Sequence, residues 1–187
     1  MKTIYYTAAS LDGFLADPEN SLEWLFQFQP PEGEDNYEVF AKDVGALAMG
    51  STTYEWLLNH EIFPEGGIPK PWFYSQPTWV FTSRALRIVE GADIRFVKGD
   101  VAPVHAEMTK AAGDKNLWVV GGGELAGQFY DQGLLDELVI SFASVTLGEG
   151  APLLPRRIIS PPLKLLSARQ WGDGFAVLKY AVPKPEK

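Results

Sequence analysis

Residues 117–136 read LWVVGGGELAGQFYDQGLLD, and this stretch decides how the rest of the chain is interpreted. An apolar run typical of a β-strand, 117–120, ends at three consecutive glycines. The helical spacing that follows places Leu125, Phe129 and Tyr130 on one face. A strand that stops at glycines and continues as a helix directs free backbone N–H groups and a positive dipole end at the space above the turn. The stretch therefore predicts a site for an anionic group.

The same glycines have two further interpretations. Gly121, Gly123 and Ala126 fit the G-x-G-x-x-A spacing of Rossmann turns. A Rossmann unit also carries an acidic residue at the end of the next strand, roughly 20 residues on. Here that strand ends in Val145 and Thr146, and the turn comes late in the chain, so this interpretation is weak. Glycines required only for tight packing are the other alternative, which the entropy cost of three in a row disfavours.

The composition limits what the chain can bind. Its 187 residues, 46% hydrophobic and 21% charged, predict one domain over residues 1–182 and a solvated tail over 183–187. A net charge of −8 and a pI near 4.8 argue against nucleic acid and membrane surfaces as partners. Without cysteine there is no disulfide, thiolate metal site or cysteine nucleophile. The first residues do not resemble a signal peptide, and we expect a cytoplasmic protein.

Strand and helix patterns alternate along the chain. We expect strands at 3–9, 46–50, 77–84, 93–97, 117–120, 136–145, 163–171 and 175–182. We expect helices at 34–43, at 51–58, at 101–113 with Asp100 as N-cap, and after the three glycines. A long loop covers 59–77, and the last two strands form a hairpin across Gly172 and Gly174. The pattern predicts an α/β fold whose mainly parallel sheet is finished by antiparallel strands.

Two other strand ends resemble parts of an anion site. The stretch MGSTTYE, 49–55, repeats the strand, glycine and helix order with hydroxyl groups, although an ordinary capped helix would look the same. The stretch FTSR, 81–84, offers two hydroxyls and a guanidinium, which suit a phosphate monoester, although a lone Arg is often only solvated. Three such ends on one sheet predict a dinucleotide lying across the strand C-termini.

Five stretches occur in an order that resembles a known family. They read SLDGFLA, MGSTTYE, PTWVFTSR, VVGGGELAGQFYDQGLLDEL and LGEGAPLL. This order is similar to the dihydrofolate reductase family, and most similar to the stand-alone relatives of the riboflavin-biosynthesis reductase C-terminal domain, over residues 3–180. The resemblance implies a three-layer dihydrofolate reductase-like fold, NADPH as cofactor, and a homodimer packed through the C-terminal strands.

The resemblance also implies which positions hold NADPH. The pyrophosphate turn would comprise Gly121, Gly122, Gly123, Glu124 and Leu125; the second phosphate-binding unit Gly50, Ser51, Thr52 and Thr53; the 2′-phosphate end Thr82, Ser83 and Arg84; and the nicotinamide end Ala8, Ala9 and Gly13. Members of the family usually have a basic residue where this chain has Ser51. Arg84 would then supply most of the positive charge, and the preference for NADPH over NADH depends on it.

The proton donor is harder to place from the sequence. Folate reductases present a buried carboxylate from the helix after the first loop, which here offers Asp35 and Glu38. Ser141 takes the place where the family has a hydroxyl in the substrate pocket. Asp12 is a further catalytic candidate near the nicotinamide edge, although Asp-Gly is also a common tight turn.

Two histidines and an aromatic set complete the candidates. His60 and His105 have no partner at metal spacing, so we expect surface residues and no metal site. The aromatic set is expected mainly in the core, with part of it at the mouth of the pocket; it comprises Trp56, Phe63, Trp72, Phe73 and Tyr74.

These observations lead to one functional prediction and two alternatives. The resemblance implies an NADPH-dependent oxidoreductase, similar to 5-amino-6-(5-phosphoribosylamino)uracil reductase or to dihydrofolate reductase, acting on a pteridine-like or ribosyl-pyrimidine-like heterocycle. A true dihydrofolate reductase is the first alternative, disfavoured by the uncertain carboxylate. A nucleotide-binding protein without turnover is the second, since it would share every glycine.

Overall fold

The computed structural model describes residues 1–28 and 36–184, and its centre is an eight-stranded sheet in the order β5-β4-β3-β6-β1-β7-β10-β9. The strands of this sheet are β1 Thr3–Ser10, β3 Val44–Gly50, β4 Thr78–Phe81, β5 Ile94–Val97, β6 Asn116–Gly121, β7 Glu137–Ala143, β9 Lys164–Trp171 and β10 Phe175–Ala181. The short strands β2 Phe14–Ala16 and β8 Ala151–Pro152 form a second, two-stranded sheet.

The pairing directions confirm the predicted fold class. Strands β5, β4, β3, β6, β1 and β7 run parallel to one another, whereas β10 pairs antiparallel with both β7 and β9. The predicted hairpin joins β9 to β10, and Gly172 in its turn has a φ of 58°, a conformation that favours glycine. The carboxyl ends of the parallel strands therefore meet at one edge, where open α/β sheets bind ligands.

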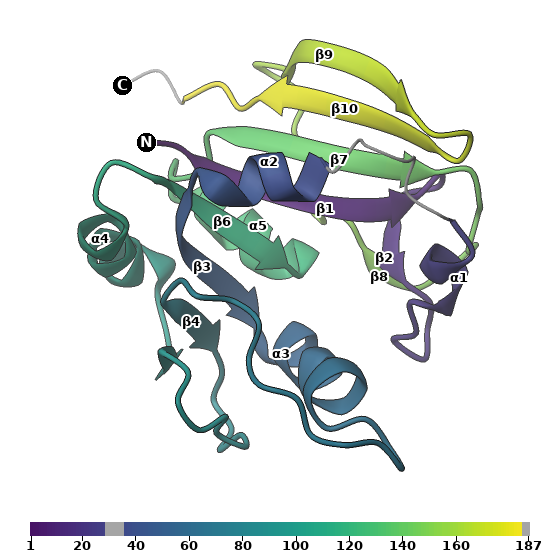
Figure 1. Ribbon diagram of the computed structural model, residues 1–187. Coiled ribbons are helices and arrows are strands. Elements are labelled where there is room, and N and C mark those ends of the chain that lie inside the picture. The colour runs from purple at the N-terminus through teal and green to yellow at the C-terminus, as the bar shows by residue number, and fades with distance from the viewer. Residues whose placement is uncertain (29–35, 185–187) are drawn as a thin grey trace.

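Helices cover both faces of the sheet, as Figure 1 shows for α2 across β1 and for α5 on the opposite face. The helices are α1 Glu23–Phe26, α2 Asn36–Lys42, α3 Ser51–Leu57, α4 Val101–Ala112 and α5 Gly123–Asp131, and α3 continues into a π-helical turn, Leu58–Ile62. On the α4 and α5 face, Tyr5, Leu117 and Phe129 share one buried cluster. Side chains alternate along strands, so Trp118 faces the other side, where it packs with Phe40 of α2.

Local sequence signals explain where several helices begin. The Asp100 carboxylate accepts a hydrogen bond from the Ala102 N–H at 3.0 Å, so the predicted N-cap of α4 is confirmed. The predicted loop at 59–77 is wrong at its start, because the chain stays helical as far as Ile62 before the extended segment begins. No helix in the described ranges is long and apolar enough to span a bilayer.

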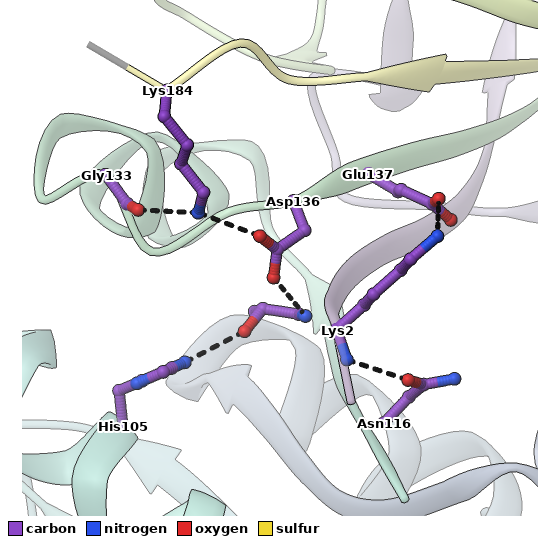
Figure 2. A network of polar contacts seen from close by, with 8 residues as sticks. Lys2, His105, Asn116, Gly133, Asp136, Glu137 and Lys184 are labelled. Carbon is purple, nitrogen blue, oxygen red and sulfur yellow. Dashed lines mark hydrogen bonds and ion pairs between the residues drawn. The ribbon is translucent and has the colours of Figure 1, made fainter. Parts of the chain in front are cut away.

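A polar network ties the two chain ends to the amino edge of the sheet, opposite the ligand-binding edge (Figure 2). The Asp136 carboxylate accepts from the Thr3 N–H at 2.8 Å and pairs with Lys184 at 2.8 Å. The Glu137 side chain is 5% exposed and pairs with Lys2, and its Oε2 lies 2.9 Å from Lys179 Nζ. This network holds β1 and β7 in register with the end of β10.

His105 on α4 departs from the sequence prediction. It is half-buried rather than a surface residue, and its Nε2 shares a 2.9 Å hydrogen bond with the Thr3 hydroxyl. Burial lowers the pKa of His105 below its ordinary value. The ring lies beside Phe129, with the ring centres 6.1 Å apart, so His105 is part of the packing between α4 and α5.

Candidate cofactor and substrate cavity

One large cavity, about 1170 Å³, lies along the carboxyl edge of the parallel strands. It is lined in part by residues 98–99 after β5, 81–83 at the end of β4, 50–53 after β3, 121–125 after β6, and 6–8 of β1. In the sheet these strands are neighbours in that order. The cavity therefore crosses five adjacent strands and suits an elongated ligand.

The three glycines of the turn after β6 serve different purposes. A Cβ on Gly123 would lie 2.2 Å from the Pro152 carbonyl oxygen and 2.4 Å from that of Leu153, so packing against this loop requires glycine. A Cβ on Gly121 would meet the Thr53 hydroxyl at 3.0 Å. A Cβ on Gly122 would meet only Leu15, at 3.9 Å, so the space beside Gly122 is open to a guest.

The first turn of α5 leaves its backbone N–H groups available. Gly122 is the N-cap residue and has no side chain to cap them. Glu124 is turned toward Arg156, which donates to both of its carboxylate oxygens at 2.8 Å and holds the Glu124 pKa below its ordinary value. Arg156 also donates to Asp131 at the other end of α5 at 2.8 Å, so it fixes the helix beside the cavity.

The unit after β3 lies opposite that turn. A Cβ on Gly50 would lie 3.9 Å from both the Gly121 carbonyl oxygen and the Gly122 nitrogen, so the two glycine turns face each other across a narrow space. Ser51, Thr52 and Thr53 line the cavity beside this space. The arrangement is a cradle that backbone and hydroxyl groups provide for a phosphate-sized group.

The β4 end of the cavity holds the basic groups. Thr82 and Ser83 line it, whereas Arg84 turns toward α3. Arg84 donates to Glu55 Oε1 at 3.1 Å and to the Ser51 hydroxyl at 3.1 Å, and it also pairs with Glu55 Oε2. Lys98, directly after β5, also lines the cavity and was not among the predicted site residues.

At the β1 end, one of the three nicotinamide candidates lines the cavity. Ala8 does so, whereas the neighbouring Ala9 is fully buried on the other side of the strand. Gly13 has a φ of 87° in the turn after β1, and its carbonyl accepts from the Leu153 N–H at 2.9 Å. Gly13 therefore connects the first loop to the loop that packs on Gly123.

The catalytic candidates within the described residues lie in different elements. Asp12 accepts from the Ser10 hydroxyl at 2.6 Å and from the Gly148 N–H at 2.7 Å, bonds that lower its pKa and hold the loop at Leu147. Glu38 is exposed on α2, and Asp35 lies outside the described residues. Ser141 lies on β7 beside Ala8, one strand beyond the cavity-lining β1.

Comparison with known proteins shows the family of this chain. The profile of the RibD C-terminal domain family matches residues 51–177, more than half of the chain. The chain belongs to the RibD C-terminal domain family. It is 29% identical over 173 residues to the uncharacterized protein YwjB of Bacillus subtilis, covering 92% of this chain and 93% of YwjB.

Two solved structures share the fold of this chain. A proposed riboflavin biosynthesis protein from Shewanella sp. PV-4 is 26% identical, with a TM-score of 0.81 and coverage of 98% of this chain and 100% of that one. The Thermotoga maritima diaminohydroxyphosphoribosylaminopyrimidine deaminase/5-amino-6-(5-phosphoribosylamino)uracil reductase matches with a TM-score of 0.63 and 15% identity. That match covers 97% of this chain and 56% of the Thermotoga chain and shows a shared fold.

Within this RibD C-terminal domain, the sequence predicted more of the residues that line the glycine-turn part of the cavity than of those that line the part near α1. Most of the predicted cofactor positions line the cavity; the exceptions are Ala9, Gly13 and Arg84. The part that the sequence missed includes the apolar side chains of Leu22, just before α1, Leu25 of α1 and Trp118 of β6. His60 also lines the cavity and is exposed, as predicted. Lys98 could have been predicted from the sequence, because it lies between a strand pattern and a glycine, where the other parts of the site also begin.

Proposed function

We propose that this RibD C-terminal domain is an NADPH-dependent reductase of a small heterocycle, pteridine-like or ribosyl-pyrimidine-like. The observation that carries the proposal is the cavity that crosses the carboxyl ends of five neighbouring strands. Basic and hydroxyl groups lie at its β5 and β4 end, two facing glycine turns at its middle, and the backbone of β1 at the other end. A dinucleotide needs these three environments in this order.

The residues present fit such a cofactor. The open space beside Gly50 and Gly122 and the uncapped N–H groups of α5 suit the pyrophosphate. Lys98, Thr82 and Ser83 suit a 2′-phosphate. When bound, NADPH supplies a hydride. The protein orients the cofactor along the sheet edge and presents the substrate from the α1 and α3 side. Asp12 is unsuited to donate a proton near neutral pH, because its oxygens already accept hydrogen bonds and its pKa is lowered.

Two glycine variants test the cofactor site. In Gly50→Val and Gly122→Val, the new side chain enters the space where the two turns face each other, so we expect NADPH binding to be lost. Fluorescence titration measures binding, and circular dichroism with urea denaturation checks that the variants fold. The parent protein should also consume NADPH with a pterin, a flavin precursor or a pyrimidine nucleoside. Folded variants that bind NADPH like the parent would contradict the proposed site.

We also propose that the protein is a homodimer joined through its C-terminal strands. β9 is an edge strand of the sheet, and Leu165 and Leu166 on it are 53% and 44% exposed. Exposed apolar strands at a sheet edge favour association. Light scattering should give about twice 20.7 kDa, and Leu166→Glu should give the monomer mass. A monomeric parent at micromolar concentration would refute the dimer without affecting the cofactor site.

A further inference from the structure

We propose that the substrate of this site is a flat compound without a phosphate group, bound by aromatic contact rather than by charge. The inference rests on the proposed function, because it concerns the part of the cavity that the cofactor would leave free. That part lies between α1, α3 and the face of the sheet that carries Trp118.

Aromatic rings build one side of this space. The rings of Trp56 and His60 are stacked with their centres 4.4 Å apart and an angle of 11° between their planes. Phe26 of α1 stacks on Trp56 from the other element, with ring centres 6.1 Å apart. Leu22, just before α1, and Leu25 of α1 line the same cavity. A wall of stacked rings and aliphatic chains suits another flat ring system.

The floor of the space is also aromatic. Trp118 lines the cavity from β6, and its indole N–H already donates to the Tyr6 carbonyl at 2.9 Å. The indole N–H is therefore already used and offers a ligand no hydrogen bond. Phe40 and Tyr6 stack on each other at 4.3 Å and contact Trp118 edge-on, which fixes the ring in place.

The charges around this space are acidic. Glu19 lines the cavity three residues before Leu22. Between residues 3 and 63 the sequence contains a single Lys or Arg, Lys42, whereas Asp and Glu recur throughout. Lys42 lies at the end of α2 just before β3 begins, at the amino edge of the sheet away from the cavity. Lys98 lines the opposite end of the cavity, beside β4.

A phosphorylated substrate would need a cation or a helix N-terminus for its phosphate. The open glycine turns at α3 and α5 are used by the cofactor in the proposed function. A phosphate at the α1 end would instead meet Glu19, and repulsion would weaken binding. The site therefore differs from one that holds a phosphoribosyl group, which the name of the Thermotoga enzyme specifies for its substrate.

Matched compound pairs test the inference. The protein is saturated with NADP⁺, which prevents turnover, and titrated by calorimetry with riboflavin and flavin mononucleotide, neopterin and its monophosphate, and uridine and uridine monophosphate. In each pair that binds, we expect the unphosphorylated member to bind about tenfold tighter or more. Equal or tighter binding of the phosphorylated members, or binding of no compound, overturns the inference.

Three variants add a second measurement. Trp56→Ala should weaken binding of the unphosphorylated compounds about tenfold and leave the affinity for NADPH unchanged. Phe73 is an exposed aromatic residue elsewhere, so Phe73→Ala should change neither affinity. Glu19→Lys should strengthen the phosphorylated members about two- to fivefold. If the parent protein does not bind NADP⁺, the proposed function itself is overturned. If it binds NADP⁺ but prefers the phosphorylated compounds, only this inference is overturned.

Discussion

Replacing Glu55 by Gln should tighten binding of NADPH while leaving NADH unchanged. Glu55 lines the cavity at the end proposed for the 2′-phosphate, and both of its carboxylate oxygens bond to Arg84. Arg84 also donates to the Ser51 hydroxyl. To bind a phosphate, the Arg84 guanidinium must break its ion pair with Glu55 or contact both groups at once. The carboxylate therefore competes with the cofactor for the Arg84 charge that the family resemblance implies for NADPH recognition.

The expected magnitude follows from the exposure of the pair. The Arg84 side chain is 55% exposed and that of Glu55 is 36% exposed, so the pair is worth about 0.2–1 kcal/mol. Repulsion between the carboxylate and the phosphate adds a term of similar size. Together they predict a gain of about 0.4–2 kcal/mol, which lowers the NADPH Kd about two- to thirtyfold.

Fluorescence titration with NADPH and NADH at low salt measures the effect, and the gain should shrink at high salt because exposed charges are screened. Lys98→Ala should have the opposite effect and weaken the binding of NADPH relative to that of NADH. Glu124→Gln is the matched control: Glu124 lines the cavity at the pyrophosphate turn, which both cofactors contain, so their affinity ratio should stay constant. An equal change for NADPH and NADH in Glu55→Gln, or no change, would refute the reasoning.

Two predictions concern stability. Gly123→Ala should lower the free energy of unfolding by about 1–3 kcal/mol, since its Cβ meets two backbone carbonyls, while Gly50→Ala, whose Cβ has room, should not. Burial raises the Glu137 pKa, but Lys2 and Lys179 outweigh it and the pKa is lowered. Its contribution is therefore complete above about pH 4.5 and is lost as the pH falls through the folded-state pKa; urea denaturation of Glu137→Gln should show a weaker acid dependence.

The sequence predicted the features that local chemistry determines. The cap at Asp100, the hairpin at Gly172 and the order of strands and helices each depend on residues within one turn or one period. The π-helical turn Leu58–Ile62 was missed, because a continuation of α3 depends on packing of Leu58 and Ile62 in a cluster formed with distant strands. The four-residue helix α1 is too short for its spacing to be recognised.

The cavity shows why contacts between distant residues escaped prediction. Glu55 and Arg84 are 29 positions apart, and Asp12 bonds to Gly148 across 136 positions. In each pair, nothing in the sequence around one residue indicates that it contacts the other. Trp118 is ambiguous for another reason: a tryptophan inside an apolar strand looks like core, and it is 6% exposed, yet its ring lines the cavity. The same side chain is part of the core and lines the cavity.

The glycine turn shows the same overlap between packing and binding. The sequence presented packing and ligand approach as alternatives for Gly121, Gly122 and Gly123. In the structure Gly123 is required by the carbonyls of Pro152 and Leu153, whereas Gly122 borders open space. The two demands are linked, because the loop that packs on Gly123 lines the cavity at Pro152. A change at Gly123 should therefore disturb both stability and cofactor binding, and a change at Gly122 should affect binding alone.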